Sequence, residues 1–369
     1  MKLLLLGGGH AHVEVLRRLA LAPVPGLRIT VIAREPAALY TGMLPGVIRG
    51  DYPERAARVT LAPLAAAARA RLIVAEAVGL DLGGRLVRMT DGGEAAFDLL
   101  SLDLGGAPAI PPGAAGIPVK PIGRFLATFA RRLADGRLAD GLRREAALAV
   151  VGGGAGGTEL AIALRRRPGT RAAVHLVCDA LLPEAPRRAR RLAAAALAEA
   201  GVVLHEGARA AGANDAGVAL EDGGKVAAGT VLWATGVHGA PFLAASGLAC
   251  DAAGCVRVDA GLRSLSHRFV FAAGDCAALD PPRPKAGVWA VRAGPHLADA
   301  IRRAALARPP LPWRPQRRAL AIMGLGDGRA LAWRGGFVLS GRLAWWWKDR
   351  LDRRWVARYA APDAPEGKE

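Results

Sequence analysis

Two clusters of glycine in the chain have the spacing that binds the pyrophosphate of a dinucleotide. Gly152, Gly154 and Gly157 fit the pattern G-x-G-x-x-G, and Gly7 and Gly9 fit its first two positions. The first glycine allows a tight turn, the second lets a pyrophosphate approach the backbone, and the third permits close packing of a helix on a strand. Free N–H groups at the start of the helix then stabilise the phosphate charge. The chain is therefore predicted to bind two dinucleotides.

The first loop is imperfect, because His12 stands in the place of the third glycine. An acid that binds ribose hydroxyls is expected about 20 residues beyond each loop. Glu35 and Asp179 lie near these places, each displaced slightly, and each could instead be an ordinary surface acid. No arginine adjoins Asp179, which favours NADH, but Arg187 and Arg188 follow closely enough to leave NADPH open.

Each glycine loop lies between short apolar runs that are typical of buried parallel strands. Residues 3–6 precede the first loop and 27–33 follow its helix, and 148–151 and 173–177 flank the second in the same way. This order predicts two β-α-β units in one chain. Further strands are predicted at residues 97–102, 231–233 and 269–272. We expect an α/β fold with two Rossmann-like dinucleotide-binding domains of three layers each.

The order of these motifs resembles a known superfamily. The two glycine loops are followed by Ala-Thr-Gly at 234–236 and Ala-Gly-Asp at 273–275. This order is similar to that of the two-dinucleotide-domain flavoproteins of the pyridine nucleotide-disulfide oxidoreductase superfamily, in the branch that resembles type II NADH dehydrogenases. Residues 7–12, 40–46 and 285–292 are similar to flavin proteins fused to, or found near, selenide, water dikinase.

The resemblance implies that the NAD domain is inserted in the FAD domain. It implies domains at 1–122 and 246–308 for FAD, at 123–245 for NADH, and a C-terminal segment at 309–369. The first loop would hold the FAD pyrophosphate, and the second would hold NADH with Glu159 near the nicotinamide. Glu159 could also be an acid that the helix dipole favours. The implied contacts are Gly7, Gly9, His10, Ala11, His12, Glu35, Gly274 and Asp275 with FAD, and Gly152, Gly154, Gly157, Glu159, Asp179 and Gly236 around NADH.

The sequence departs from relatives that use a redox disulfide. Such members carry a pair of cysteines where this chain has Tyr40 and Met43. These two residues could line the acceptor side of the flavin or be core filler. Cys250 and Cys255 have a suitable spacing but lie in a predicted hairpin turn. A dithiol reductase and a sulfide:quinone reductase are therefore both disfavoured.

The resemblance implies hydride transfer from NADH to flavin, followed by passage of electrons to an acceptor. Lys285 and a helix beginning near Pro295 are candidates to stabilise reduced flavin, although Lys285 could be a solvated loop lysine. Val288 and Arg292 replace glutamines that relatives place near quinone. A quinone remains the favoured acceptor. The alternatives are a soluble flavin reductase of selenium or sulfur metabolism and a non-enzymatic redox sensor that binds flavin and NADH.

The net charge of +18 is concentrated at the C-terminal end, where residues 313–360 carry +8. Six of the eight tryptophans also follow residue 310. A predicted helix places Leu343, Trp347, Leu351, Trp355 and Tyr359 at steps of four. A basic, tryptophan-rich helix suits a membrane interface. The stripe could instead pack on the core or on a second copy of the chain in a homodimer, and no nucleic-acid motif is found.

The remaining composition excludes several other classes. No apolar run reaches the length of a transmembrane helix, and no signal peptide is recognised. The four cysteines are too few for a disulfide scaffold and form no C-x-x-C pair that would suggest structural zinc. We expect no metal. We also expect a cytoplasmic protein, with a peripheral position on the inner membrane face as the extension of the membrane hypothesis.

Overall fold

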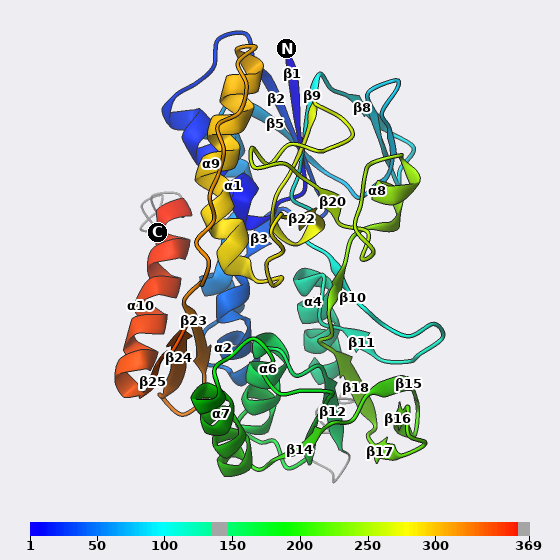
Figure 1. Ribbon diagram of the computed structural model, residues 1–369, viewed down its shortest axis with the longest axis vertical. Coiled ribbons are helices and arrows are strands. Elements are labelled where there is room, and N and C mark those ends of the chain that lie inside the picture. Colours follow the sequence, from blue (N-terminus) through cyan, green and yellow to red (C-terminus); the bar gives the residue numbers. More distant parts are fainter. Residues whose placement is uncertain (135–146, 361–369) are drawn as a thin grey trace, which may run out of the picture.

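The computed structural model describes residues 1–134 and 147–360, and shows two α/β lobes stacked along the long axis (Figure 1). The lobe that contains the N-terminus has a five-stranded parallel sheet in the order β21-β9-β1-β2-β5. Its strands are β1 (Lys2–Leu6), β2 (Arg28–Ala33), β5 (Ala70–Val74), β9 (Leu99–Leu102) and β21 (Val270–Ala272). Because β21 follows the whole second lobe in sequence, the second lobe is inserted in the first.

Both faces of this sheet are covered, since the whole run Leu3–Leu6 is buried. Helices α1 (His10–Leu21) and α9 (Gly287–Ala305) run side by side, and α3 (Leu61–Ala67) packs on α1 and β5. The same core includes side chains of the antiparallel strands β6 (Ala77–Asp81) and β7 (Leu86–Met89), to which β8 (Glu94–Ala96) is paired.

The second lobe repeats the arrangement around a parallel sheet in the order β11-β18-β12-β13-β14. Its strands are β11 (Ile117–Pro118), β12 (Leu148–Val151), β13 (Val174–Cys178), β14 (Val202–Glu206) and β18 (Thr230–Trp233). Its helices are α4 (Ile122–Ala134), α6 (Ala155–Arg165) and α7 (Arg187–Ala200), and its antiparallel strands are β15 (Ala210–Asn214), β16 (Gly217–Leu220) and β17 (Lys225–Ala227). The α/β fold with two Rossmann-like lobes is therefore confirmed.

Shorter elements connect these parts. They are β3 (Ala37–Leu39), η1 (Thr41–Met43), α2 (Leu44–Arg49), η2 (Glu54–Ala57), β4 (Arg58–Thr60), β10 (Ala107–Pro108), β19 (Val237–His238), α8 (Pro241–Ala245), β20 (Val256–Arg257), η3 (Gly274–Cys276) and β22 (Ala277–Ala278). Residues 135–146 and 361–369 of the predicted domain ranges lie outside the described residues.

The C-terminal segment is a meander of β23 (Ala321–Gly324), β24 (Ala330–Arg334) and β25 (Phe337–Gly341), followed by helix α10 (Arg342–Tyr359). Figure 1 shows α10 alongside this sheet at the edge of both lobes. The predicted apolar stripe is wrong, because Leu343 and Leu351 are exposed. Steps of four residues drift around a helix of 3.6 residues per turn, by about 160° over four such steps. The buried face is Ala344, Lys348, Asp352, Trp355 and Tyr359.

The start of α9 also differs from the sequence prediction. The helix begins at Gly287, and Pro295 lies inside it rather than at its beginning. The turns before Pro295 pack tightly on α1: a Cβ at Gly294 would lie 2.8 Å from the Cβ of Glu14. Burial of this helix face outweighs the local tendency of proline to end a helix. The N-terminus of α9 therefore lies close to η1, where a Cβ at Gly287 would meet the hydroxyl of Thr41 at 2.9 Å.

Candidate active site

The first glycine loop forms the predicted tight turn between β1 and α1. Gly7 has φ +104°, and a Cβ there would lie 2.2 Å from the carbonyl oxygen of Asp103. Gly9 is the N-cap of α1, and because glycine has no side chain it cannot cap the helix with a side-chain hydrogen bond. The N–H groups of the first helical turn are therefore available to acceptors from elsewhere in the fold or from a ligand.

His12 has a structural role in place of the third glycine. Its Nδ1 lies 2.7 Å from the Gly7 carbonyl oxygen, and its Nε2 lies 2.8 Å from the Ser101 hydroxyl on β9. Burial lowers the pKa of His12 to about 4, so the ring is neutral near pH 7. Nδ1–H therefore donates to Gly7, and Nε2 accepts from Ser101. These two hydrogen bonds hold the loop against the sheet. They take the place of the close helix–strand packing that a third glycine would permit.

Asp103 is a residue of this site that the sequence prediction missed. It follows β9, is almost completely buried, and accepts the N–H groups of Ala11 and His12 at 2.8 and 3.1 Å. Burial raises the pKa of its carboxyl group to about 7. The available signal was an acid at the carboxyl end of a strand that pairs with β1, because ligands of such folds lie at that edge.

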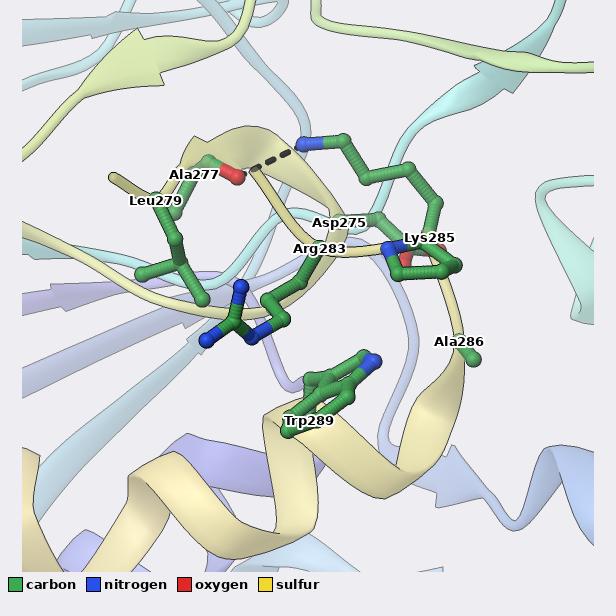
Figure 2. A pocket seen from close by; sticks show the side chains of 9 residues that line it. Asp275, Ala277, Leu279, Arg283, Lys285, Ala286 and Trp289 are labelled. Atoms are coloured by element: carbon green, nitrogen blue, oxygen red, sulfur yellow. Dashed lines mark hydrogen bonds between the residues drawn. The ribbon is translucent and has the colours of Figure 1, made fainter. Parts of the chain in front are cut away.

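Asp275 and Gly274 lie in η3, where a Cβ at Gly274 would lie 2.5 Å from Oδ1 of Asp103. The cation at Asp275 is Lys120, whose Nζ lies 2.6 Å from Oδ2. Lys285, the predicted cation for reduced flavin, donates to the carbonyl of Ala277 at 2.6 Å (Figure 2). Lys120 was detectable in the sequence as one of only six lysines, placed where the chain crosses between the lobes.

The other predicted FAD contacts surround the same edge. Glu35 directs its carboxylate to the first turn of α4, where a Cβ at Gly123 would be 1.9 Å from Oε2. His10 begins α1, and its Nε2 is enclosed without a partner among the described residues. Its ring contacts Tyr40 and Trp355, with centroids 5.5 and 4.9 Å away. An enclosed, unpaired nitrogen at a helix N-terminus fits a phosphate-bearing ligand.

The second glycine loop fits a pyrophosphate well. Gly152 has φ +129°, and a Cβ at Gly157 would lie 2.0 Å from the Gly152 carbonyl oxygen. These contacts match the roles of the first and third glycines. Gly154 and Gly236 face open space. The loop therefore leaves room for a ligand at the N-terminus of α6.

The two acids of the second unit have different surroundings. Asp179 is exposed beyond β13 and pairs with Arg209 at 2.8 Å. Glu159 is largely buried on α6, accepts the N–H of Gly324 at 2.7 Å, and lies 3.7 Å from Nζ of Lys348. Glu159 thus links the second lobe to the C-terminal segment, a contact that sequence spacing could not reveal.

A buried charge cluster lies where both lobes meet α10. Nζ of Lys348 donates to the Gly42 carbonyl at 2.6 Å and to Asp352 at 2.8 Å. Burial raises the pKa values of Glu159 and Asp352. Burial opposes the charge of Lys348, but both carboxylates outweigh it and raise its pKa. We define Lys348, Glu159 and Asp352 as the junction cluster.

The predicted acceptor-side residues Tyr40 and Met43 border this cluster. Tyr40 stacks on Trp355 with centroids 4.4 Å apart, and burial followed by the charge of Asp352 raises the pKa of its hydroxyl. Met43 is buried among Tyr52 and its neighbours. All four cysteines are free, and no group of three potential metal-ligating side chains occurs among residues 1–134 and 147–360.

Comparisons with known proteins agree with this geometry. The model of the family described as pyridine nucleotide-disulphide oxidoreductase matches residues 1–300. The chain belongs to this family. It is an FAD-dependent oxidoreductase that uses a pyridine nucleotide, and FAD and NADH are its cofactors. The glycine loops, the unpaired His10 nitrogen and the open space at Gly154 fit these two groups.

Solved structures share the fold at low sequence identity. The sulfide:quinone oxidoreductase of Aquifex aeolicus is 18% identical with a TM-score of 0.75, over 98% of this chain and 93% of that one. The NAD-dependent persulfide reductase of A. fulgidus is 21% identical with a TM-score of 0.73, over 90% of this chain but only 63% of that one. The water-forming NADH oxidase of Lactobacillus brevis is 18% identical with a TM-score of 0.70, over 90% and 74%. A search of curated proteins found no match.

Proposed function

We propose that this protein oxidises NADH and passes the electrons through FAD to a quinone, without a redox disulfide, as in the type II NADH dehydrogenase-like branch. The observation that carries the proposal is the junction cluster, which buries two carboxyl groups and one ammonium group beside Tyr40 and η1. The overall reaction converts NADH, one proton and a quinone into NAD⁺ and a quinol. FAD, when bound, accepts the hydride of NADH and passes two electrons onward.

Among the described residues, none of the four cysteines lies in the segment that we assign to the acceptor side. By the resemblance, the segment Tyr40–Met43 stands where thiol-dependent relatives have a redox disulfide. It packs against α10 and the N-terminus of α9. Cys276 is fully buried, and burial strongly raises the pKa of its thiol. Because a thiolate is needed for disulfide chemistry, an acceptor from outside the chain is favoured.

A quinone needs protons on its oxygens as well as electrons. Glu159 and Asp352 have raised pKa values through burial, and Lys348 supplies a cation between them. A carboxyl group with a raised pKa takes up a proton more readily than an ordinary one, and it can give that proton up when a nearby oxygen gains negative charge. The cluster also holds α10 against η1, because Lys348 donates to the Gly42 carbonyl. In this proposal α10 and η1 together form one side of the acceptor site.

The test separates the two half-reactions. NADH should bleach the flavin of the purified protein in anaerobic stopped-flow, and a short-chain quinone should restore its colour. Glu159→Gln should slow reoxidation by quinone about 10²-fold or more, while ferricyanide, which takes up no proton, should reoxidise it at the wild-type rate. Glu221→Gln, on an exposed acid of the second lobe, is the control. Bleaching without recovery by quinones, but with recovery by selenium or sulfur compounds, would replace the quinone by that acceptor class.

The exposed face of α10 supports a place at an anionic membrane surface. Leu343 and Trp346 are exposed on it, and the Arg350 guanidinium lies 5.7 Å from the Trp346 ring. No helix among the described residues is both long and apolar enough to span a bilayer. The proposal is therefore docking on the surface through tryptophan and arginine.

Vesicle flotation tests this docking. The protein should float with vesicles that contain anionic lipid, and Trp346→Glu should reduce the bound fraction about tenfold. Leu265→Glu, at an exposed leucine of the first lobe, should leave flotation unchanged. Equal flotation of Trp346→Glu and wild type would contradict docking through α10.

A further inference from the structure

Asp103 and the pyrophosphate of FAD are directed to the same helix terminus. The carboxylate accepts the N–H groups of Ala11 and His12 in the first turn of α1. These are the groups with which such a turn binds a dinucleotide phosphate. A second anion therefore arrives at a terminus that already carries a carboxylate.

The carboxyl group of Asp103 is enclosed by backbone that only glycine permits. A Cβ at Gly9 would lie 2.3 Å from its Cγ, and a Cβ at Gly274 would lie 2.5 Å from its Oδ1. The residue is 3% exposed. Because both walls are backbone, the carboxyl group has little room to turn away from the helix terminus. It must share the site with the phosphate rather than leave it.

Burial and the charge of Asp275 favour the neutral form of Asp103, whereas the hydrogen bonds from His12 and Ala11 favour its charged form. Asp275 adds a second carboxylate from η3, although Lys120 pairs with it at 2.6 Å. His12 faces the loop as a neutral ring. Like charges in a buried site disfavour ionisation, and a pyrophosphate adds further negative charge. The other titratable groups near this edge are His10 at the start of α1, Cys276 in η3, and Lys285, which is turned toward Ala277.

We propose that Asp103 takes up a proton from solvent when the FAD pyrophosphate binds at α1, so that FAD binding is coupled to protonation of this carboxyl group. The protonated acid remains in place and can donate its O–H to a phosphate oxygen, and the N–H groups of α1 can donate to the phosphate as well. When FAD leaves, the proton returns to solvent. The inference depends on FAD binding but on neither the acceptor nor the membrane.

The coupling fixes the sign of a pH dependence. Binding raises the pKa of Asp103 above its value without FAD, which burial places at about 7. FAD should therefore bind with constant affinity well below that pH. Above it the dissociation constant should rise by up to about tenfold per pH unit, because each binding event must take up one proton.

The experiment uses the purified flavoprotein. Dilution series between about pH 6 and pH 8.5, followed by the fluorescence of released FAD, give the dissociation constant at each pH. A pH indicator in weakly buffered solution counts protons set free per FAD released. We expect close to one proton near the upper end of the range. Asp103→Asn keeps the shape and can donate to phosphate, so it should bind FAD more tightly than wild type there, without pH dependence or proton release.

His10→Gln is the matched control, since His10 is the other group near this terminus that could gain a proton. It should weaken FAD binding, because His10 belongs to the predicted FAD site, but the number of protons set free per FAD released should stay close to one. A wild-type count of zero overturns the inference without need of a variant, and so does an Asp103→Asn protein that still releases a proton. Failure to bind FAD at any pH would contradict the cofactor assignment, whereas pH-independent binding contradicts the coupling alone.

Discussion

Replacing Lys348 by methionine should strongly destabilise the docking of α10. The side chain is 7% exposed, and its Nζ lies 2.8 Å from Asp352 and 3.7 Å from Glu159. Its removal leaves two carboxyl groups buried without their cation. Breaking a buried ion pair by removing one partner costs about 3–5 kcal/mol. We expect a loss of this size in the free energy of unfolding near pH 8.

The loss should shrink as the pH falls. Burial already raises the pKa values of Glu159 and Asp352, and removal of Lys348 raises them further. The folded variant then binds protons more tightly than the unfolded chain. The extra instability is therefore present above the unfolded pKa values of about 4 and grows until the pH exceeds the folded pKa values. Urea denaturation at about pH 5.5 and pH 8, followed by tryptophan fluorescence, measures both values.

Arg353→Met is the matched control on the same helix. Its side chain is 60% exposed and pairs with Asp349 at 2.9 Å, so its loss should cost about 0–1 kcal/mol. Adding Glu159→Gln to Lys348→Met removes one of the two buried carboxylates that have lost their cation, and it should recover part of the lost free energy of unfolding. Equal effects of Lys348→Met and Arg353→Met, or a loss that does not change with pH, would refute the reasoning.

Two further predictions concern the second glycine loop. Gly157→Ala places a Cβ 2.0 Å from the Gly152 carbonyl oxygen and should cost about 1–3 kcal/mol by overpacking, whereas Gly156→Ala faces open space and should stay within about 0.5 kcal/mol in the same urea titration. Asp179→Ser should free Arg209 to face a 2′-phosphate and lower the kcat/KM preference for NADH over NADPH about tenfold or more, and adding Arg209→Ala should cancel that change.

The sequence predicted the parts of the fold that are determined locally. The apolar runs before each glycine loop became β1 and β12, and the helices began at His10 and Ala155. Such elements follow from side-chain period and from the few residues that tolerate tight turns. Local patterns also produced the errors. Residues at steps of four in α10 do not lie on one helix face, and tertiary packing buries a different set of residues. Pro295 does not end α9, because the helix face around it is buried against α1.

By itself, the sequence determined two dinucleotide loops, the α/β class and the absence of cysteines at Tyr40 and Met43. Tertiary structure decided which charges meet. Lys120 reaches Asp275 across 155 positions, and Lys348 reaches the Gly42 carbonyl across 306. Asp103 meets α1 across 92 positions at Ala11. A glycine loop consists of neighbouring residues and can be recognised in the sequence. An ion pair between distant segments depends on how the sheets and helices pack. For that reason the contact of Lys120 with Asp275, the place of Asp103 and the junction cluster were found only in the folded chain.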